Sequence, residues 1–157
     1  MEKSKVEQFP FQRIDQVGVV VRDIDQAVEH YSSLGIGPFE TLNVTRFGRE
    51  MYGKPVGDEV KSLVRIARLR GVQFELVQPV SGESIQKKFL ETRGEGINHL
   101  GFFVNDFEKE VARLVKKGFK VIQTHKYVGG GGIAYFDTGE IGGVLFELIQ
   151  WPPNMRI

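Results

Sequence analysis

Two glutamates lie in the middle of short apolar segments, where a carboxylate is unexpected. Glu75 belongs to the segment GVQFELVQ and Glu147 to GVLFELIQ, and each glutamate follows a Phe and precedes a Leu. The two segments match at six of eight positions when the chain is shifted by 72 residues. Burying a carboxylate on such a strand costs free energy unless the group is paired, protonated or bound to a cation. Two equivalent carboxylates therefore require one shared explanation.

A second equivalent pair consists of Gln16 and His99, which are related by a shift of 83 residues. Alternation along a strand puts Gln16 on one face with Gly18, and His99 on one face with Gly101. If these two side chains and the two carboxylates converge, they can bind one divalent metal ion (zinc, cobalt, nickel or manganese) with one or two positions open for substrate. The alternative is that the strands have one solvated face and that all four side chains are exposed.

The elements that must position these residues occur twice in the chain. Residues 14–35 match residues 97–118 without a gap, and the six identical positions include Gly18 and Gly101. Because both matched regions run in the same order, we interpret the chain as one pseudo-symmetric domain. The predicted boundaries are 1–157 for the domain, about 11–80 for the first module, 81–96 for a linker and about 97–151 for the second module.

Each module has the same predicted order of a strand, a helix and three strands, written βαβββ. The first strand is an apolar run, followed by Asp23 or Asp106 as the helix N-cap and by Gly35 or Gly118 just beyond the helix. A short helix is expected in the linker at 84–92. The predicted strands cover residues 17–21, 39–45, 62–69, 72–77, 100–104, 120–125, 133–137 and 144–149.

Composition excludes several classes of site. The chain has 157 residues, 41% of them hydrophobic and 26% charged, with a formal net charge of +1, so charge indicates no nucleic-acid partner. Cysteine is absent, which excludes disulfides, thiolate metal sites and cysteine nucleophiles. The segment MEKSKVEQFP is not apolar enough for a signal peptide, and no run approaches the length of a membrane helix. We expect a cytoplasmic protein without a membrane partner.

The repeated polar positions, together with GEGINHLGFFVND and GGVLFEL, resemble the glyoxalase, or vicinal-oxygen-chelate, superfamily over residues 14–151. The resemblance implies an α+β fold in which two βαβββ modules form a cupped mixed sheet around a metal site, the glyoxalase/bleomycin resistance/dioxygenase fold. It implies Gln16, Glu75, His99 and Glu147 as the ligands of one divalent metal ion. It also implies a homodimer, to which the apolar segment 149–157 could contribute.

Two subfamilies share this resemblance. The second half of the chain is most similar to methylmalonyl-CoA epimerases, whereas the ligand set Gln, Glu, His, Glu resembles that of zinc-type glyoxalase I. In both, a metal stabilises an enolate while a carboxylate moves a proton. The resemblance thus implies an epimerase or isomerase acting on an acyl-CoA thioester, with Glu147 as ligand and base and Glu75 as its partner. The alternatives are a glyoxalase I-like lyase acting on a thiol adduct and a non-catalytic small-molecule-binding protein.

The segment VTRFGREMYGKPVGDEVKSL departs from the epimerase pattern, and it contains further candidates. Glu50 or Glu59 is a candidate second base, and two arginines and a lysine near Tyr52 are either solvated or contact the phosphates of a CoA-type ligand. We expect the glycines at 129–132 to form a hairpin rather than a phosphate loop. We also expect the histidines outside the ligand set to be solvated, which argues against a two-histidine iron dioxygenase. The two arginines are Arg46 and Arg49, the lysine is Lys54, and the histidines outside the ligand set are His30 and His125.

Overall fold

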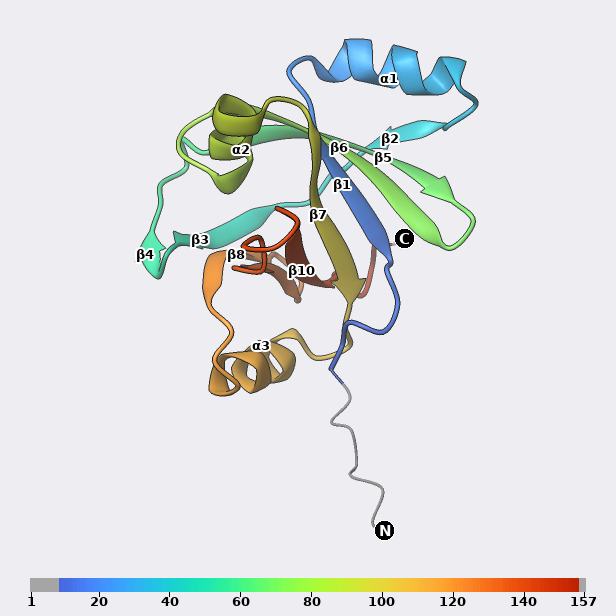
Figure 1. The fold of residues 1–157 in the computed structure, drawn as a ribbon. Helices are drawn as coiled ribbons and strands as arrows, with labels where there is room; N and C mark the ends of the chain where they lie inside the picture. Colours follow the sequence, from blue (N-terminus) through green and yellow to red (C-terminus); the bar gives the residue numbers. More distant parts are fainter. Residues whose placement is uncertain (1–8, 156–157) are drawn as a thin grey trace.

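The computed structural model describes residues 9–155, and its strands form one ten-stranded mixed sheet (Figure 1). The strand order is β2-β5-β6-β1-β7-β10-β9-β8-β3-β4. The elements in chain order are β1 (Gln16–Val20), α1 (Ile24–Ser33), β2 (Phe39–Thr41), β3 (Arg46–Met51), β4 (Lys54–Pro55), β5 (Lys61–Leu69), β6 (Val72–Ser81), α2 (Ile85–Arg93), β7 (Gly96–Phe103), α3 (Phe107–Lys116), β8 (Val121–Tyr127), β9 (Gly132–Phe136) and β10 (Leu145–Gln150).

The two halves of the sheet repeat one arrangement. From the centre outward, the first half runs β1, β6, β5, β2 and the second runs β7, β10, β9, β8. In each half the first and last strands of the module pair in parallel, and the two first strands, β1 and β7, pair antiparallel at the centre. The predicted α+β fold with two βαβββ modules in a cupped mixed sheet is therefore confirmed.

The curvature of the sheet follows from one short connection. Strand β2 and strand β3 are eight positions apart in the strand order, which corresponds to roughly 38 Å in a flat sheet. The segment 42–45 that joins them spans at most about 18 Å. Leu42 N–H donates to Val64 at one end of this segment, and Thr45 accepts from Val128 at the other. The sheet must therefore curl so that its two edges approach each other.

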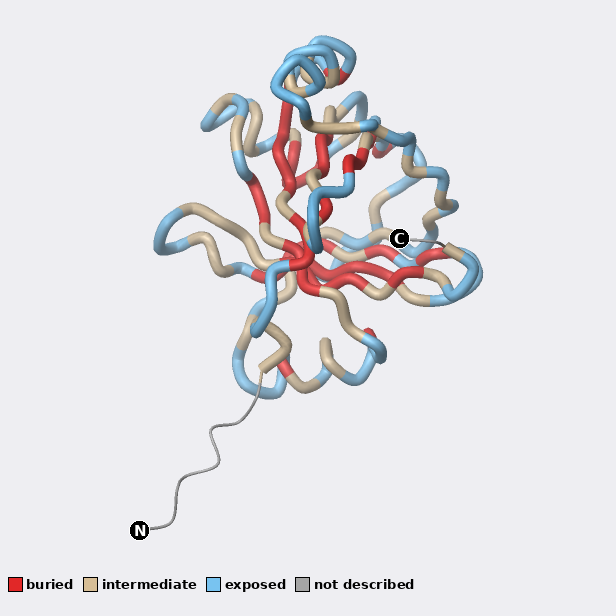
Figure 2. Tube along the Cα trace, turned by 90° about the vertical axis from the view of Figure 1, so that its right-hand side faces the viewer, coloured by how far each residue is buried: buried red, intermediate tan, exposed pale blue. Residues whose placement is uncertain are grey.

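Three apolar clusters stabilise this arrangement, and the buried residues concentrate in the strands (Figure 2). One cluster, which includes Leu76, lies beneath α1, and a second, which includes Leu148, lies beneath α3. The third fills part of the concave side and contains Val64, Ile149 and Trp151. Alternation along the strands separates these clusters, because neighbouring residues point to opposite faces of the sheet.

The two long helices begin in the same way in both modules. Asp23 and Asp106 are the N-caps, as predicted; the carboxylate of Asp23 accepts from two backbone N–H groups of the first turn and that of Asp106 from one. Gln78 and Gln150, which end the repeated segments, accept from the first N–H of α1 and α3 respectively. This contact ties each helix to the last strand of its own module and gives a structural reason for the repeated glutamine.

The largest difference from the predicted elements lies between β2 and β5. The strand predicted at 39–45 ends at Thr41, and residues 46–55, which no predicted strand covers, form the hairpin of β3 and β4. Strand β3 pairs antiparallel with β8 of the other module. The hairpin therefore belongs to the first half by sequence and extends the second half of the sheet.

The other predicted elements are present, although β6 continues to Ser81 and β7 begins at Gly96, each four residues beyond the predicted strand. The linker helix is α2 with Ser84 as its N-cap, and residues 128–131 form the turn of the β8–β9 hairpin. No helix among residues 9–155 is long and apolar enough to cross a membrane. The N-terminal segment 1–8 and the end of the apolar tail, 156–157, lie outside the described residues.

Candidate metal and substrate site

The four predicted ligands lie in two neighbouring rows across the four central strands. In one row Gly18 of β1 pairs with Glu75 of β6 on one side and with His99 of β7 on the other. In the second row Gly101 of β7 pairs with Gln16 of β1 and with Glu147 of β10. Each row therefore has a glycine between two of the four polar side chains. The duplication thus repeats the central glycines as well as the polar side chains beside them.

The glycines leave the space that the polar side chains occupy. A Cβ atom at Gly18 would overlap the imidazole ring of His99, and a Cβ atom at Gly101 would lie 2.8 Å from Cβ of Gln16. Real Cβ atoms essentially never approach that closely. The identity of residues 18 and 101 between the modules is thus explained by close side-chain approach.

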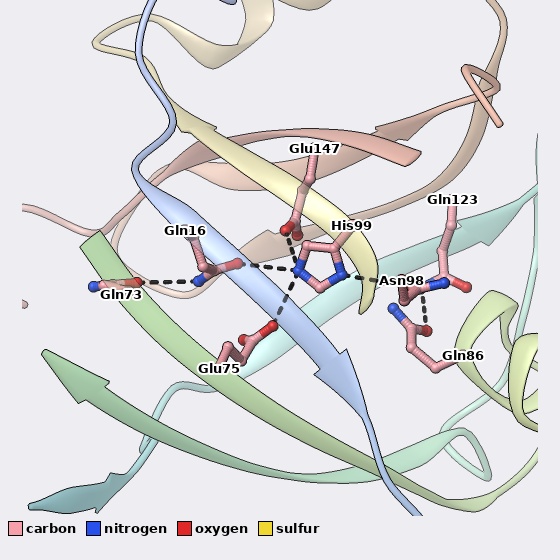
Figure 3. A network of polar contacts seen from close by, with 8 residues as sticks. All are labelled: Gln16, Gln73, Glu75, Gln86, Asn98, His99, Gln123 and Glu147. Atoms are coloured by element: carbon pink, nitrogen blue, oxygen red, sulfur yellow. Dashed lines mark hydrogen bonds and ion pairs between the residues drawn. The ribbon is translucent and has the colours of Figure 1, made fainter. Parts of the chain in front are cut away.

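Three side-chain oxygens surround one nitrogen of His99 (Figure 3). Oε1 of Gln16, Oε2 of Glu75 and Oε2 of Glu147 each lie 3.1 Å from Nε2 of His99. All four side chains are buried, and His99 is 0% exposed. The structure therefore brings all four predicted ligands together and excludes the alternative that they are solvated.

Neighbouring amides fix the orientation of two of these side chains. Asn98 Oδ1 lies 3.2 Å from Nδ1 of His99 and can only accept, so Nδ1 carries a hydrogen. Gln16 donates its amide NH₂ to Oε1 of Gln73 at 3.0 Å, which turns its own Oε1 toward Nε2 of His99. Such outer partners usually orient the ligands of a metal ion.

The polar cluster leaves buried acceptors unsatisfied. Nε2 of His99 can hold at most one proton, yet it faces three oxygens that accept hydrogen bonds. Oε2 of Glu75 and Oε2 of Glu147 are buried and share this one nitrogen, so at most one of them can accept its proton. Unpaired buried carboxylate oxygens are costly, and a cation between them and Nε2 would remove that cost.

The donor set fits a divalent metal ion. Two ligand atoms about 2.1 Å from one ion, at right angles to each other, lie roughly 3.0 Å apart, close to the three distances to Nε2. Imidazole, carboxylate and amide oxygen suit the predicted metals. Within residues 9–155, no three His, Asp or Glu side chains already have the full geometry of a metal site. Metal binding by these residues therefore stays a proposal.

Burial and charge act against each other on the titratable groups of this cluster. Burial alone would lower the pKa of His99, but the charges and hydrogen bonds of Glu147 and Glu75 raise that pKa to about 10. Burial raises the pKa of Glu147 more than the nearby imidazole lowers it. Burial, followed by the charge of Glu147, also raises the pKa of Tyr135, whose ring packs edge-on against His99 at 5.1 Å. Without a metal ion, the cluster therefore retains protons.

A small cavity opens beside the polar cluster on the concave side of the sheet. Its volume is about 50 Å³, enough for a few water molecules. Gln16, Glu75 and Glu147 reach its wall, together with Tyr127 and Tyr135. We call this space the inner cavity.

The expectation that His125 is solvated was wrong. Its side chain is 8% exposed and lines the inner cavity, whereas His30 on α1 is exposed as predicted. Burial, and then the positive charges of Arg46 and Arg49, lower the pKa of His125 well below its usual value. Gln123, His125 and Tyr127 alternate along one face of β8, but this pattern alone does not indicate that the face is buried.

The segment that departs from the epimerase pattern contributes two arginines to the inner cavity. Arg46 and Arg49 both reach its wall, while Lys54 and Tyr52 are exposed and do not. The candidate bases Glu50 and Glu59 are also exposed and lie outside this wall.

Comparisons with known proteins agree with this fold. A sequence profile of the glyoxalase/bleomycin resistance protein/dioxygenase superfamily matches residues 15–136. The uncharacterized protein YqjC of Bacillus subtilis is 26% identical over 140 residues, which cover 88% of this chain and 91% of that protein.

Solved structures of methylmalonyl-CoA epimerases have the same fold. The epimerase of Mycobacterium tuberculosis is 26% identical, with a TM-score of 0.66 and coverage of 89% of this chain and 88% of that one. A Streptomyces coelicolor epimerase variant in complex with 2-nitronate-propionyl-CoA is 23% identical, with a TM-score of 0.68 and coverage of 92% and 97%. With its duplicated modules and cupped sheet, the chain belongs to the glyoxalase/bleomycin resistance protein/dioxygenase superfamily.

Proposed function

We propose that the protein is a metal-dependent epimerase or isomerase that acts by enolisation on an acyl-CoA thioester such as methylmalonyl-CoA. The observation that carries this proposal is the convergence of Glu75 and Glu147 on His99, where two buried carboxylate oxygens share one imidazole nitrogen. The similarity to methylmalonyl-CoA epimerases, at 26% identity in one case, supports the choice of substrate class.

In this proposal Gln16, Glu75, His99 and Glu147 hold the metal ion, which supplies positive charge that stabilises a developing enolate. Glu147 takes the proton as the C–H bond next to the thioester breaks, and the electron pair moves into the carbonyl. Glu75, which is protonated at the start of the turnover, gives its proton to the opposite face of the same carbon, so the C–H bond forms again with inverted configuration. Proton exchange with water then returns Glu147 to the carboxylate and Glu75 to the acid. Burial favours this role, because a carboxylate whose pKa is raised accepts a proton more readily.

The protein chain also controls water at the reacting carbon. The wall of the inner cavity includes the side chains of Tyr127, Tyr135, Ile149 and Trp151, and its small volume leaves little room for solvent around an acyl group. Excluding water strengthens electrostatic interactions and protects an enolate from other proton donors. A cavity of this size admits the reacting end of a thioester and not its carrier.

The direct test is exchange of the C2 hydrogen of methylmalonyl-CoA with deuterated water, followed by NMR or mass spectrometry. The protein loaded with zinc, cobalt, nickel or manganese should catalyse exchange, and Glu147→Gln should lower the rate by at least about a hundredfold. No exchange with any of these metals would refute the proposal. Binding of the thioester without exchange would instead indicate a non-catalytic binding protein.

A glyoxalase I-like lyase is the second candidate, and Gln16 favours it. Its amide oxygen points at Nε2 of His99, so the four converging groups are Gln, Glu, His and Glu, the set that resembles zinc-type glyoxalase I. Turnover of methylglyoxal with glutathione or another thiol by the metal-loaded protein would establish this activity. The expected homodimer also stays a prediction, which light scattering of the purified protein tests.

A further inference from the structure

A β-bulge in β3 turns two arginines toward the inner cavity. Arg46 pairs with Tyr127 and Glu50 pairs with Thr124, but the register between β3 and β8 shifts between Phe47 and Glu50. Residues three apart on a regular strand point to opposite faces, and an extra residue at a bulge removes that alternation. Arg46 and Arg49 consequently both line the inner cavity.

Among the described residues neither arginine has a carboxylate in direct contact, although the negative charge of Asp58 acts on Arg49. No Asp or Glu oxygen within residues 9–155 forms a salt bridge with either guanidinium group. Arg49 donates one hydrogen bond to the backbone oxygen of Val60 at 2.6 Å, which positions its side chain at the cavity wall. If Glu75 and Glu147 balance a divalent metal ion, the two guanidinium groups place positive charge at the cavity wall that these two carboxylates do not offset. Such a balance favours an anionic ligand.

His125 supplies an independent sign of a missing ligand at the same place. It lies on β8 opposite the bulge, and both nitrogens of its buried ring lack a hydrogen-bond partner. The ring packs edge-on against Tyr127 at 5.2 Å, so it is held rather than free to turn away. Buried polar atoms that have no protein partner in a cavity wall usually contact a ligand or water.

We propose that Arg46, Arg49 and His125 form a subsite for a carboxylate-sized oxyanion. The substrate then carries a negatively charged group in addition to the oxygens that approach the four polar side chains. Guanidinium groups donate paired hydrogen bonds to such anions, and a neutral imidazole adds one more donor. This inference rests on the proposed function for the metal ion that balances Glu75 and Glu147 and for the identity of the reacting carbon.

The dimensions of the site suggest how the rest of the substrate lies. A larger groove of about 510 Å³ runs between the β3–β4 hairpin and β5, and it shares Arg46, Arg49, Val60 and Ser62 with the inner cavity. The two arginines therefore stand where the groove meets the cavity. A short acid would place its charged end at this junction, while a bulky carrier would extend into the groove.

The test measures binding of small probes by isothermal titration calorimetry, with the protein as purified and after zinc loading. Malonate represents the acid of an acyl unit, inorganic phosphate represents the charged part of a carrier, and malonamide is the neutral counterpart of malonate. Arg46→Gln and Arg49→Gln should each weaken malonate binding about tenfold or more, since each removes charge-assisted hydrogen bonds. Arg46→Lys, which keeps the charge, should recover part of the affinity.

Lys54→Gln is the matched control, because Lys54 is an exposed cation of the same hairpin that does not reach either space. Arginine-dependent binding of malonate supports the carboxylate source, and arginine-dependent binding of phosphate alone supports a carrier phosphate. The subsite would be overturned if both arginine variants bound the oxyanions as tightly as the wild type, or if Lys54→Gln lost as much affinity as they do. Absence of binding of either oxyanion to the wild type would overturn it too. Deuterium exchange at C2 is measured separately, so failure of enolisation and failure of the subsite remain distinguishable.

Discussion

The imidazole ring of His99 occupies the space directly above Gly18, where any side chain would overlap it. The equivalent glycine of the other module, Gly101, makes room for Gln16 in the same way. The backbone of β1 and the backbone of β7 therefore each make room for one polar group of the other strand. This reciprocal arrangement explains why the duplication retains the glycines as well as the polar residues.

Replacement of Gly18 by Ala should displace the His99 ring and abolish metal binding. Because the new Cβ overlaps a buried ring between strands, we also expect a loss of about 1–3 kcal/mol in the free energy of unfolding. Val19→Ala is the matched control, since Val19 is buried on the opposite face of the same strand beneath α1. It should lower stability by a similar amount and retain zinc. Metal analysis and urea unfolding of both variants would show whether the two effects separate.

Zinc should raise the melting temperature of the wild-type protein, because the ion binds the folded chain and not the unfolded one. Gln16→Ala, Glu75→Gln, His99→Ala and Glu147→Gln should each reduce or remove this increase, which differential scanning fluorimetry measures. The control is His30→Ala, which changes an exposed histidine on α1. A zinc effect that survives His99→Ala but disappears in His30→Ala would contradict the site.

The central part of this site was accessible from the sequence because the chain is duplicated. Glu75 alone on a strand indicates little, but Glu147 lies at the equivalent position of the second module, so both modules have a carboxylate at the same place. Strand alternation then places Gln16 and His99 on the same faces as Gly18 and Gly101. These relationships depend on local pattern and repeat spacing, so no knowledge of tertiary contacts was needed.

Two features depended on contacts that no local pattern contains. Strand β3 has the sequence RFGREM, which lacks an apolar face, and it forms because β8 provides backbone hydrogen-bonding partners from the other module. The burial of His125 also depends on tertiary contacts, because a polar residue on an alternating strand usually faces water. Here that face lies inside the cup, and pairing with β3 covers it.

Asn98 should control metal affinity without touching the ion. Its Oδ1 accepts from Nδ1 of His99, which leaves Nε2 of His99 to face the three oxygens. Asn98→Ala should weaken zinc binding about tenfold or more, because partners that orient a ligand typically have effects of that size. Gln86→Ala is a suitable control, since Gln86 is buried nearby and bonds to Gln123 instead of His99 (Figure 3). Competition with a zinc-binding dye would report both affinities, and equal affinities would contradict this role.

His125 should make the protein less stable in acid. Its pKa is lowered in the folded state by burial and by two arginines, so between about pH 6.5 and the lower folded-state pKa the unfolded chain binds a proton that the folded chain does not. Stability therefore falls as pH falls below about 6.5, by as much as about 1.4 kcal/mol per pH unit from this residue.

His125→Gln removes this contribution. As the pH falls below about 6.5, the wild type should therefore lose more unfolding free energy than the variant. Urea unfolding at several pH values from 7.5 to about 5, in metal-free buffer, measures the change, because His99 is present in both proteins and its effect cancels to first order. His30→Gln, which alters an exposed histidine, should leave the wild-type slope as it is. If the unfolding free energies of the wild type and of His125→Gln change with pH in parallel, then His125 gains a proton as easily in the folded state as in water. That result would contradict its burial beside two cations.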